Sequence, residues 1–321
     1  MKKIISLFFL LPFFASCERE ELPVPPHDPG NVITATVNME QNYKWQIYYD
    51  LGTNTVVGQN LKSIWDFGFE TSPNGYRIIL NTSKAMFAWN TNDTNFVAVT
   101  DTAGFTANRS WDEPSGNLDS TAIGDWTIHH PVYIIDRGYN ENGQVQGFRK
   151  VKIESVNATG YTLHFSLLNG TSDTTLFVPK DTTYNFSFLS FDNHGHSVMV
   201  EPPKADWDLV FTQYVHIFYN PTMPYLVTGC LLNHFETTAC RDTTDDFSVI
   251  TYTQATSRIL FPAVNTIGYD WKTFSGNTYT TDPTMNFIIR DRTGTFYKLH
   301  FIDFYNANGI KGNPKWEMQQ L

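Results

Sequence analysis

Residues 204–212 read KADWDLVFT, and residues 62–70 read KSIWDFGFE, so one pattern stands once in each half of the chain. In the later stretch the large apolar side chains of Trp207, Leu209 and Phe211 alternate with other residues. An alternation with a period of two predicts a β-strand that buries one face. The two stretches therefore predict two related strands, and the tryptophan at the head of each is expected to be buried.

Further landmarks recur in the same order in both halves. IGDW at 123–126 returns as IGYDW at 267–271, FRK at 148–150 returns as FYK at 296–298, and NATG at 157–160 returns as NANG at 306–309. Ordered matches at a nearly constant spacing indicate an internal duplication rather than a short-period solenoid. We therefore expect two tandem copies, residues 32–175 and residues 176–321.

The composition favours a mainly β protein. Aromatic residues make up 15% of the 321 residues and charged residues 17%, a balance that favours short strands joined by turns over long helices. The sequence therefore predicts antiparallel sheets in both copies and few short helices. A formal net charge of −10 argues against nucleic acid as a partner, because phosphates require a basic surface. The sequence contains no HExxH, GxSxG or phosphate-loop motif, so we expect no catalysis.

The chain begins with an export signal. A positive segment and an apolar run too short to span a membrane make residues 1–16 a signal peptide. The sequence FASC resembles a bacterial lipobox, so we expect Cys17 to be lipidated and to anchor the protein, with no membrane-spanning segment. The proline-rich residues 17–31 predict an extended tether. An acidic flank, which contains Glu18, Glu20 and Glu21, resembles the signal that sends lipoproteins of Bacteroidota to the outer cell surface. We therefore expect exposure at the cell surface, with the periplasmic face of the outer membrane as the alternative.

Two cysteines remain after lipidation, Cys230 and Cys240. An exported protein meets an oxidising compartment, where thiols at such a short separation can pair. The sequence therefore predicts a disulfide between them, with two free thiols as the alternative.

Three stretches of the second copy carry a family resemblance. WDLVFTQY begins at Trp207, PYLVTG occupies residues 224–229, and YKLHFIDFY occupies residues 297–305. Together they resemble the HmuY-type haem-binding lipoproteins of Bacteroidota, most specifically over residues 184–321. The resemblance implies a mainly β, non-enzymatic protein that captures haem at the cell surface and passes it to a TonB-dependent outer-membrane receptor. It also implies that two axial side chains, His or Met, hold the haem iron.

The second copy offers three side chains of the required chemistry. Imidazole nitrogen and thioether sulfur bind haem iron, and a porphyrin needs an apolar slot. His216 lies on the predicted long strand among aromatic residues, Met223 lies in the turn beyond it, and His234 is a third candidate. The first copy has Asn74 and Thr82 at the positions corresponding to His216 and Met223. We therefore expect the second copy to bind the haem iron.

Two other function classes remain open on the sequence alone. A surface lipoprotein with this aromatic content also fits a binder of another ligand, such as a glycan or a peptide. A structural or adhesive spacer is the third class. Titration with haemin distinguishes a haem-capturing protein from these two alternatives.

We predict that replacing Cys17 by Ala releases the protein from membranes, because the lipid would be its only anchor. Cell fractionation and labelling with palmitate measure this. Wild-type protein is the control, and a Cys17→Ala variant that still fractionates with the envelope would show that Cys17 is not the anchor.

Overall fold

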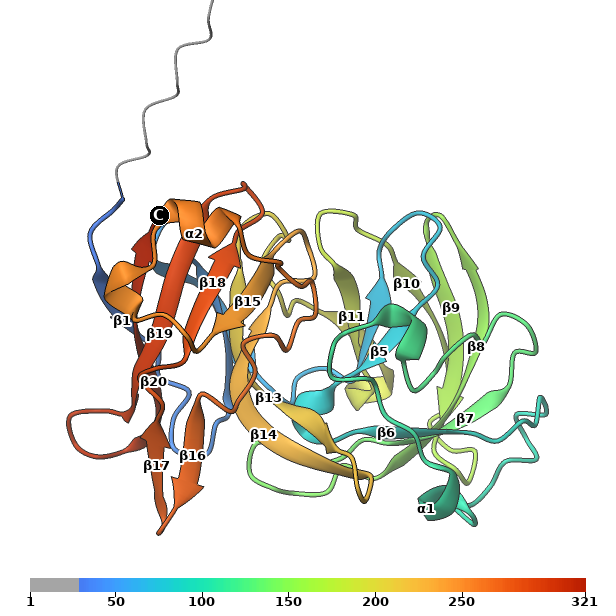
Figure 1. Cartoon of the computed structure of the whole chain (residues 1–321). Helices are drawn as coiled ribbons and strands as arrows, with labels where there is room; N and C mark the ends of the chain where they lie inside the picture. The colour runs from blue at the N-terminus through green and yellow to red at the C-terminus, as the bar shows by residue number, and fades with distance from the viewer. Residues whose placement is uncertain (1–28) are drawn as a thin grey trace, which may run out of the picture.

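The structure, a computed structural model, describes residues 29–321, so the signal peptide, Cys17 and most of the tether lie outside the described residues. Figure 1 shows two β-rich halves side by side. Within residues 29–321 the helical elements are short; they are α1 (Phe105–Asn108) and α2 (Tyr252–Thr256), with the 3-10 turns η1 (Thr82–Lys84), η2 (Leu118–Ser120), η3 (Asp192–His194) and η4 (Phe247–Val249). None of the helices in this range is long and apolar enough to cross a membrane.

The first half contains a large and a small antiparallel sheet. In spatial order the large sheet consists of β10 (Thr174–Pro179), β9 (Gly160–Ser166), β8 (Phe148–Asn157), β7 (Val132–Asp136) and β6 (Phe87–Asn90). The small sheet consists of β12 (His196–Val198), β11 (Phe186–Ser190), β4 (Phe67–Glu70) and β5 (Ile78–Leu80).

The second half repeats this arrangement. Its large sheet consists of β1 (Ile33–Thr36), β20 (Lys311–Gln320), β19 (Phe296–Tyr305), β18 (Asn286–Arg290) and β15 (Thr238–Asp242). Its small sheet consists of β14 (Met223–Leu232), β13 (Leu209–Phe218), β2 (Trp45–Asp50) and β3 (Thr55–Leu61), and a separate hairpin is formed by β16 (Lys272–Ser275) and β17 (Thr278–Thr281).

The strands of the large and small sheets correspond between the two halves, and the β16–β17 hairpin is an addition of the second half. β6, β7, β8 and β9 take the places in the first half that β15, β18, β19 and β20 take in the second, and β4–β5 corresponds to β13–β14. The repeated tryptophans Trp126 and Trp271 are both buried. The expected mainly β fold with two duplicated antiparallel halves is therefore confirmed.

The sheets do not follow the order of the two sequence copies. β1 pairs with β20 and β2 pairs with β13, so the N-terminal strands of the first copy, including β3, lie in the second half. Conversely, β10 pairs with β9 and β11 pairs with β4, so β10, β11 and β12 lie in the first half. Each copy thus places its first three strands in the other half. The expected copy boundary at residues 175 and 176 falls inside β10 and does not separate two compact units.

We call the strands that each copy places in the other half the exchanged strands. The aspartates of the two Trp-Asp pairs form hydrogen bonds with the ends of two of them. The backbone N–H of Asp66 donates to the carbonyl of Leu189 at 2.7 Å, and its carboxylate accepts the N–H of Phe191 at 2.7 Å. Asp208 makes the same two contacts with the end of β2, each at 2.9 Å. Both aspartate side chains are fully buried. Each aspartate therefore binds the end of a strand that comes from the other copy.

A pair of buried asparagines repeats in the same way. The side-chain amide of Asn81 donates to the carbonyl of Trp65 at 2.8 Å, and that of Asn233 donates to the carbonyl of Trp207 at 2.7 Å. Buried carbonyls without a partner are costly, so these bonds stabilise the chain where it enters β4 and β13.

A hydrophobic cluster between the halves depends on the exchange. The ring of Trp65 packs edge-on against Phe188 at 4.8 Å, and Trp207 packs edge-on against Tyr48 at 4.9 Å. Phe188 and Tyr48 belong to the exchanged strands β11 and β2. Trp65 is 6% exposed and Trp207 is 3% exposed, which confirms the expected burial of both side chains.

The expected disulfide between Cys230 and Cys240 does not form in the structure, where both thiols are free and buried. Cys230 on β14 packs in the core between the two sheets of the second half. Cys240 on β15 packs in a separate cluster with Ile250 and Ala255, next to α2. A disulfide requires facing Cβ atoms, and two side chains in different cores do not meet this requirement.

We predict that neither half folds alone. A chain cut in the turn after β9 gives two fragments, and the first lacks β10, β11 and β12 as partners for its own sheets. Each fragment alone should show no cooperative unfolding by near-ultraviolet circular dichroism, whereas an equimolar mixture should recover it. The intact protein nicked at the same turn is the control. A cooperative transition of either fragment alone would contradict the interdependence of the halves.

Candidate functional site

A long hairpin arm distinguishes the second half from the first. β2 pairs only with residues 209–211 of β13, so beyond them β13 pairs with β14 alone among the described strands. This arm, residues 212–229, extends from the second half toward the first, where β13 contacts η1 (Figure 1). The corresponding strands β4 and β5 have only four and three residues. The arm is therefore an elaboration of the second copy.

One face of the arm gathers an imidazole, a thioether and aromatic rings. His216 lies opposite Tyr225, and Phe218 lies opposite Met223, with no shift in register along the hairpin. Residues directly opposite each other, and residues two apart on one strand, point to the same face. The ring of Tyr269 lies 4.8 Å from that of His216. We call these five residues the arm patch, and it is open to solvent, since Met223 is 47% and Tyr225 56% exposed.

The imidazole of His216 is available as a ligand. Its half-buried ring packs against Phe218 and Tyr269 and makes no hydrogen bond to any residue between 29 and 321. Burial lowers the pKa of His216, although Asp270 and Glu113 act in the opposite direction. The neutral imidazole, which is the form that binds metals, is therefore favoured at neutral pH.

The structure brings two of the three predicted ligand residues together. Met223 stands diagonally to His216 on the arm patch, a position at which Cα atoms are ~7–8 Å apart. His234 follows the far end of β14, more than roughly 20 Å from His216 at the usual rise of a strand. Its ring packs against Phe186 at 5.2 Å, on an exchanged strand. His234 therefore belongs to a different site.

That different site is a cavity between the two halves, with a volume of about 140 Å³. It borders the cluster of Trp65 and Trp207, and both sequence copies contribute to its walls. His234 is exposed and lies at its rim beside Gly116, where an added Cβ would approach the imidazole to 2.7 Å. The carboxyl groups that line the cavity belong to Asp112, Glu113 and Glu201.

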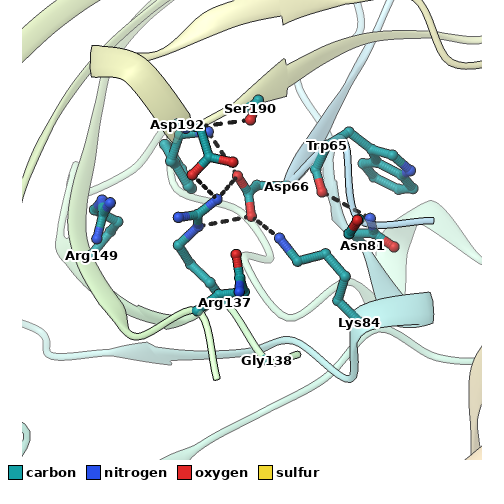
Figure 2. Close-up of polar contacts among 12 residues, drawn as sticks. Trp65, Asp66, Asn81, Lys84, Arg137, Gly138, Arg149, Ser190 and Asp192 are labelled. Carbon is teal, nitrogen blue, oxygen red and sulfur yellow. Dashed lines mark hydrogen bonds and ion pairs between the residues drawn. The ribbon is translucent and has the colours of Figure 1, made fainter. Parts of the chain in front are cut away.

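The first half buries a cluster of charges around Asp66 (Figure 2). Arg137 donates to both carboxylate oxygens of Asp66, at 3.0 and 2.9 Å, and Lys84 forms a second ion pair with it. Arg137 also reaches Asp192 of the second copy at 2.9 Å. Burial alone would raise the pKa of Asp66, but Lys84 and Arg137 outweigh it and hold the pKa below its usual value. The cluster is internally satisfied and joins the two copies.

The equivalent aspartate of the second half is less well compensated. Asp208 contacts Arg292 at 3.0 Å, and Arg292 also contacts Asp50 at 3.4 Å. Burial raises the pKa of Asp208 to about 7, despite the N–H of Leu51 and the charge of Arg292, and the hydrogen bond with Asp50 adds to the rise. The two carboxyl groups therefore share one cation, and Asp208 holds a proton over much of the acidic range.

Neither charge cluster resembles a metal centre. Across residues 29–321, no group of three His, Cys, Asp or Glu side chains is placed to hold a metal ion. A metal ion carried by an organic ring needs fewer protein ligands, because the ring supplies the remainder. The arm patch offers one imidazole and one thioether, which are the kinds of side chain that bind such an ion.

Residues 42–318 match the model of the HmuY protein family. The chain belongs to the HmuY family. This confirms the resemblance found in the sequence and extends it through both copies. A comparison with curated proteins finds no match.

Solved structures from several bacteria match most of the chain at low sequence identity. Apo PinO from Porphyromonas gingivitis is 11% identical, with 91% of this chain and 97% of that chain covered and a TM-score of 0.30. The apo HmuY analog TFO from Tannerella forsythia is 10% identical, with coverages of 92% and 98% and a TM-score of 0.25. A HmuY-like protein from Bacteroides vulgatus is 11% identical, with coverages of 93% and 97% and a TM-score of 0.20.

Two features of this HmuY-family protein were not predicted from the sequence. The cavity takes its walls from both copies, and no local pattern marks which residues meet across it. The charge cluster was partly indicated by the sequence. An aspartate that follows a buried tryptophan at the start of an apolar strand needs a cation or hydrogen-bond donors. Nothing in the sequence identified Lys84 and Arg137 as those cations.

We predict that Asp66→Asn destabilises the protein by about 3–5 kcal/mol, because it leaves two buried cations without their counter-charge. Asp208→Asn is the matched variant at the equivalent position and should cost less, because Arg292 is partly solvated and the neutral amide resembles protonated Asp208. Denaturant unfolding at pH 7 measures both changes. Equal losses for the two variants would contradict the difference in compensation.

The same variants give a test of pH dependence. Folded Asp208 keeps a proton up to about pH 7, whereas the unfolded chain releases it near its usual pKa of 3.8, so the stability that this group contributes falls as pH rises between these values. The free energy of unfolding of wild type relative to Asp208→Asn should therefore decrease over this range, by at most about 1.4 kcal/mol per pH unit. An advantage of the wild type that grows with pH would contradict the raised pKa.

Proposed function

We propose that this protein captures haem on the arm patch, with His216 and Met223 as the two iron ligands, and carries it without catalysis. The observation that supports this most is the placement of one imidazole and one thioether on the same exposed face of the arm, in a member of the HmuY family. These are the two kinds of side chain that hold haem iron in carrier and electron-transfer proteins.

The other three residues of the arm patch are suited to contact the porphyrin ring. Phe218, Tyr225 and Tyr269 offer flat apolar surfaces, and the rings of Phe218 and Tyr225 lie 6.0 Å apart. Aromatic side chains of this kind line most sites for planar cofactors. Two protein ligands complete the coordination of haem iron, which suits a carrier and leaves no position for a reacting substrate.

The position of the arm suits capture and release. Beyond residue 211 the arm has a single strand partner, and its end is exposed, so it opens at a lower free energy than the sheets behind it. Thioether side chains adapt easily to a ligand that enters or leaves. We place the protein at the outer membrane, anchored by a lipid on Cys17 and exposed at the cell surface, with a TonB-dependent receptor as the recipient.

We predict that wild-type protein shows a shift of the Soret band on titration with haemin. His216→Ala should weaken binding at least about 10-fold, the lower end of the loss that even an indirect contact to a metal site produces. Met223→Ala should change the spectrum with a smaller loss, since the imidazole remains. His196→Ala is the matched control, because His196 is an exposed strand histidine on β12, in the other half.

Two results would contradict the proposal. If wild type shows no Soret shift at micromolar haemin in either redox state, the arm patch takes another ligand, and its exposed aromatic rings then favour a glycan or a peptide. If haemin binds but His196→Ala weakens it as much as His216→Ala does, binding is not localised on the arm.

A further inference from the structure

The cavity between the halves has features of a binding site that the arm patch does not use. Its volume of about 140 Å³ is close to that of an engineered cavity of about 150 Å³ that holds benzene. Its walls include Tyr48, Trp65 and Trp207, which are at most 6% exposed and are held by the exchanged strands. These walls therefore belong to the buried interior, in contrast to the exposed end of the arm.

The charged groups that line the cavity are acidic. Asp112, Glu113 and Glu201 line it, and none of the described lysines or arginines does. Asp112 and Glu201 are both 7% exposed, so water compensates little of their charge. A buried carboxylate is costly unless a cation faces it.

The two buried carboxyl groups have hydrogen bonds but no ion pair within the described residues. Asp112 accepts the N–H of Leu80 at 2.6 Å and that of Ala122 at 2.8 Å. Glu201 accepts the N–H of Asn185 at 2.6 Å and that of Phe186 at 3.0 Å. These bonds orient both groups rigidly without supplying a positive charge.

The surroundings leave this negative charge uncompensated. Burial raises the pKa of both Asp112 and Glu201 to about 7, although the backbone donors act against it. Lys204 acts on Glu201 only at longer range, and its ammonium group lies over the ring of Phe235 at 4.8 Å. A cation inside the cavity would remove this penalty for both carboxyl groups.

We propose that the cavity binds a small organic cation, an amine or quaternary ammonium group of about five to seven non-hydrogen atoms. Aromatic walls and nearby carboxylates are the two features that recognise such cations, through attraction to the ring faces and to the negative charge. The formal net charge of −10 adds a long-range attraction for cations. The site is independent of haem, since it shares no residue with the arm patch.

The rim of the cavity offers an entrance. His234 is exposed there, and Gly116, with a φ of +75°, lies against it on the loop that carries Glu113. Glu113 accepts a hydrogen bond from the hydroxyl of Tyr219 at 3.2 Å, at the tip of the arm. A ligand would therefore enter beside the loop of residues 112–121 rather than through the arm patch.

The decisive comparison is between choline and its neutral isostere, in which a carbon atom replaces the nitrogen. Isothermal titration calorimetry of the purified full chain should show saturable binding of choline at least about 10-fold tighter than of the isostere, because the cation alone gains from the ring faces and carboxylates. Tryptophan fluorescence should change with choline, since Trp65 and Trp207 border the cavity. Equal affinities, or no binding of choline by the folded protein, would overturn the proposal.

Three variants locate the binding. Leu231→Phe should abolish binding of choline by filling the cavity, with no change in charge, and Glu201→Gln should weaken it about 10-fold while preserving the shape of the side chain. His216→Ala on the arm patch should bind choline as wild type does, even where it no longer binds haemin. Folding of each variant is checked by its unfolding transition. Undiminished binding by folded Leu231→Phe would place choline on the surface and refute the site.

Discussion

The contact between each Trp-Asp aspartate and a strand from the other sequence copy is the constraint on which the rest of this fold depends. Asp66 and Asp208 are fully buried, and each fixes the end of an exchanged strand by two backbone hydrogen bonds. The exchanged strands complete both small sheets and cover Trp65 and Trp207. Neither half therefore has a complete core of its own, and the duplication produced one interdependent structure instead of two domains.

The duplication is symmetric in topology and asymmetric in charge. Two cations compensate Asp66, whereas Asp208 shares Arg292 with a second carboxyl group. The less well compensated aspartate stands immediately before β13, the strand that continues into the arm. At this point the second half continues into a long hairpin, whereas the corresponding strands of the first half are short.

The arm and the cavity differ in the ligand chemistry they present. The arm patch is open to solvent and offers neutral donors of the type that bind iron, together with aromatic faces, which suits a large planar ligand. The cavity lies between the halves, is small, and is lined by carboxyl groups. The two proposed sites share no residue, so each can be tested by substitutions that leave the residues of the other unchanged.

Local periodicity in the sequence determined the strands and the duplication, because alternation needs only neighbouring residues. The sequence predicted Met223 in a turn, whereas the structure makes it the first residue of β14, and the hairpin register places it on the same face as His216. The tertiary structure alone decided which strands pair. β11 pairs with β4 and β2 pairs with β13, and Asp66 and Asp208 hold the ends of these two strands by contacts between residues far apart in the sequence. The same holds for the two cysteines and the cavity. Cys230 and Cys240 are close in sequence but lie in different cores, and the cavity exists only where two copies meet.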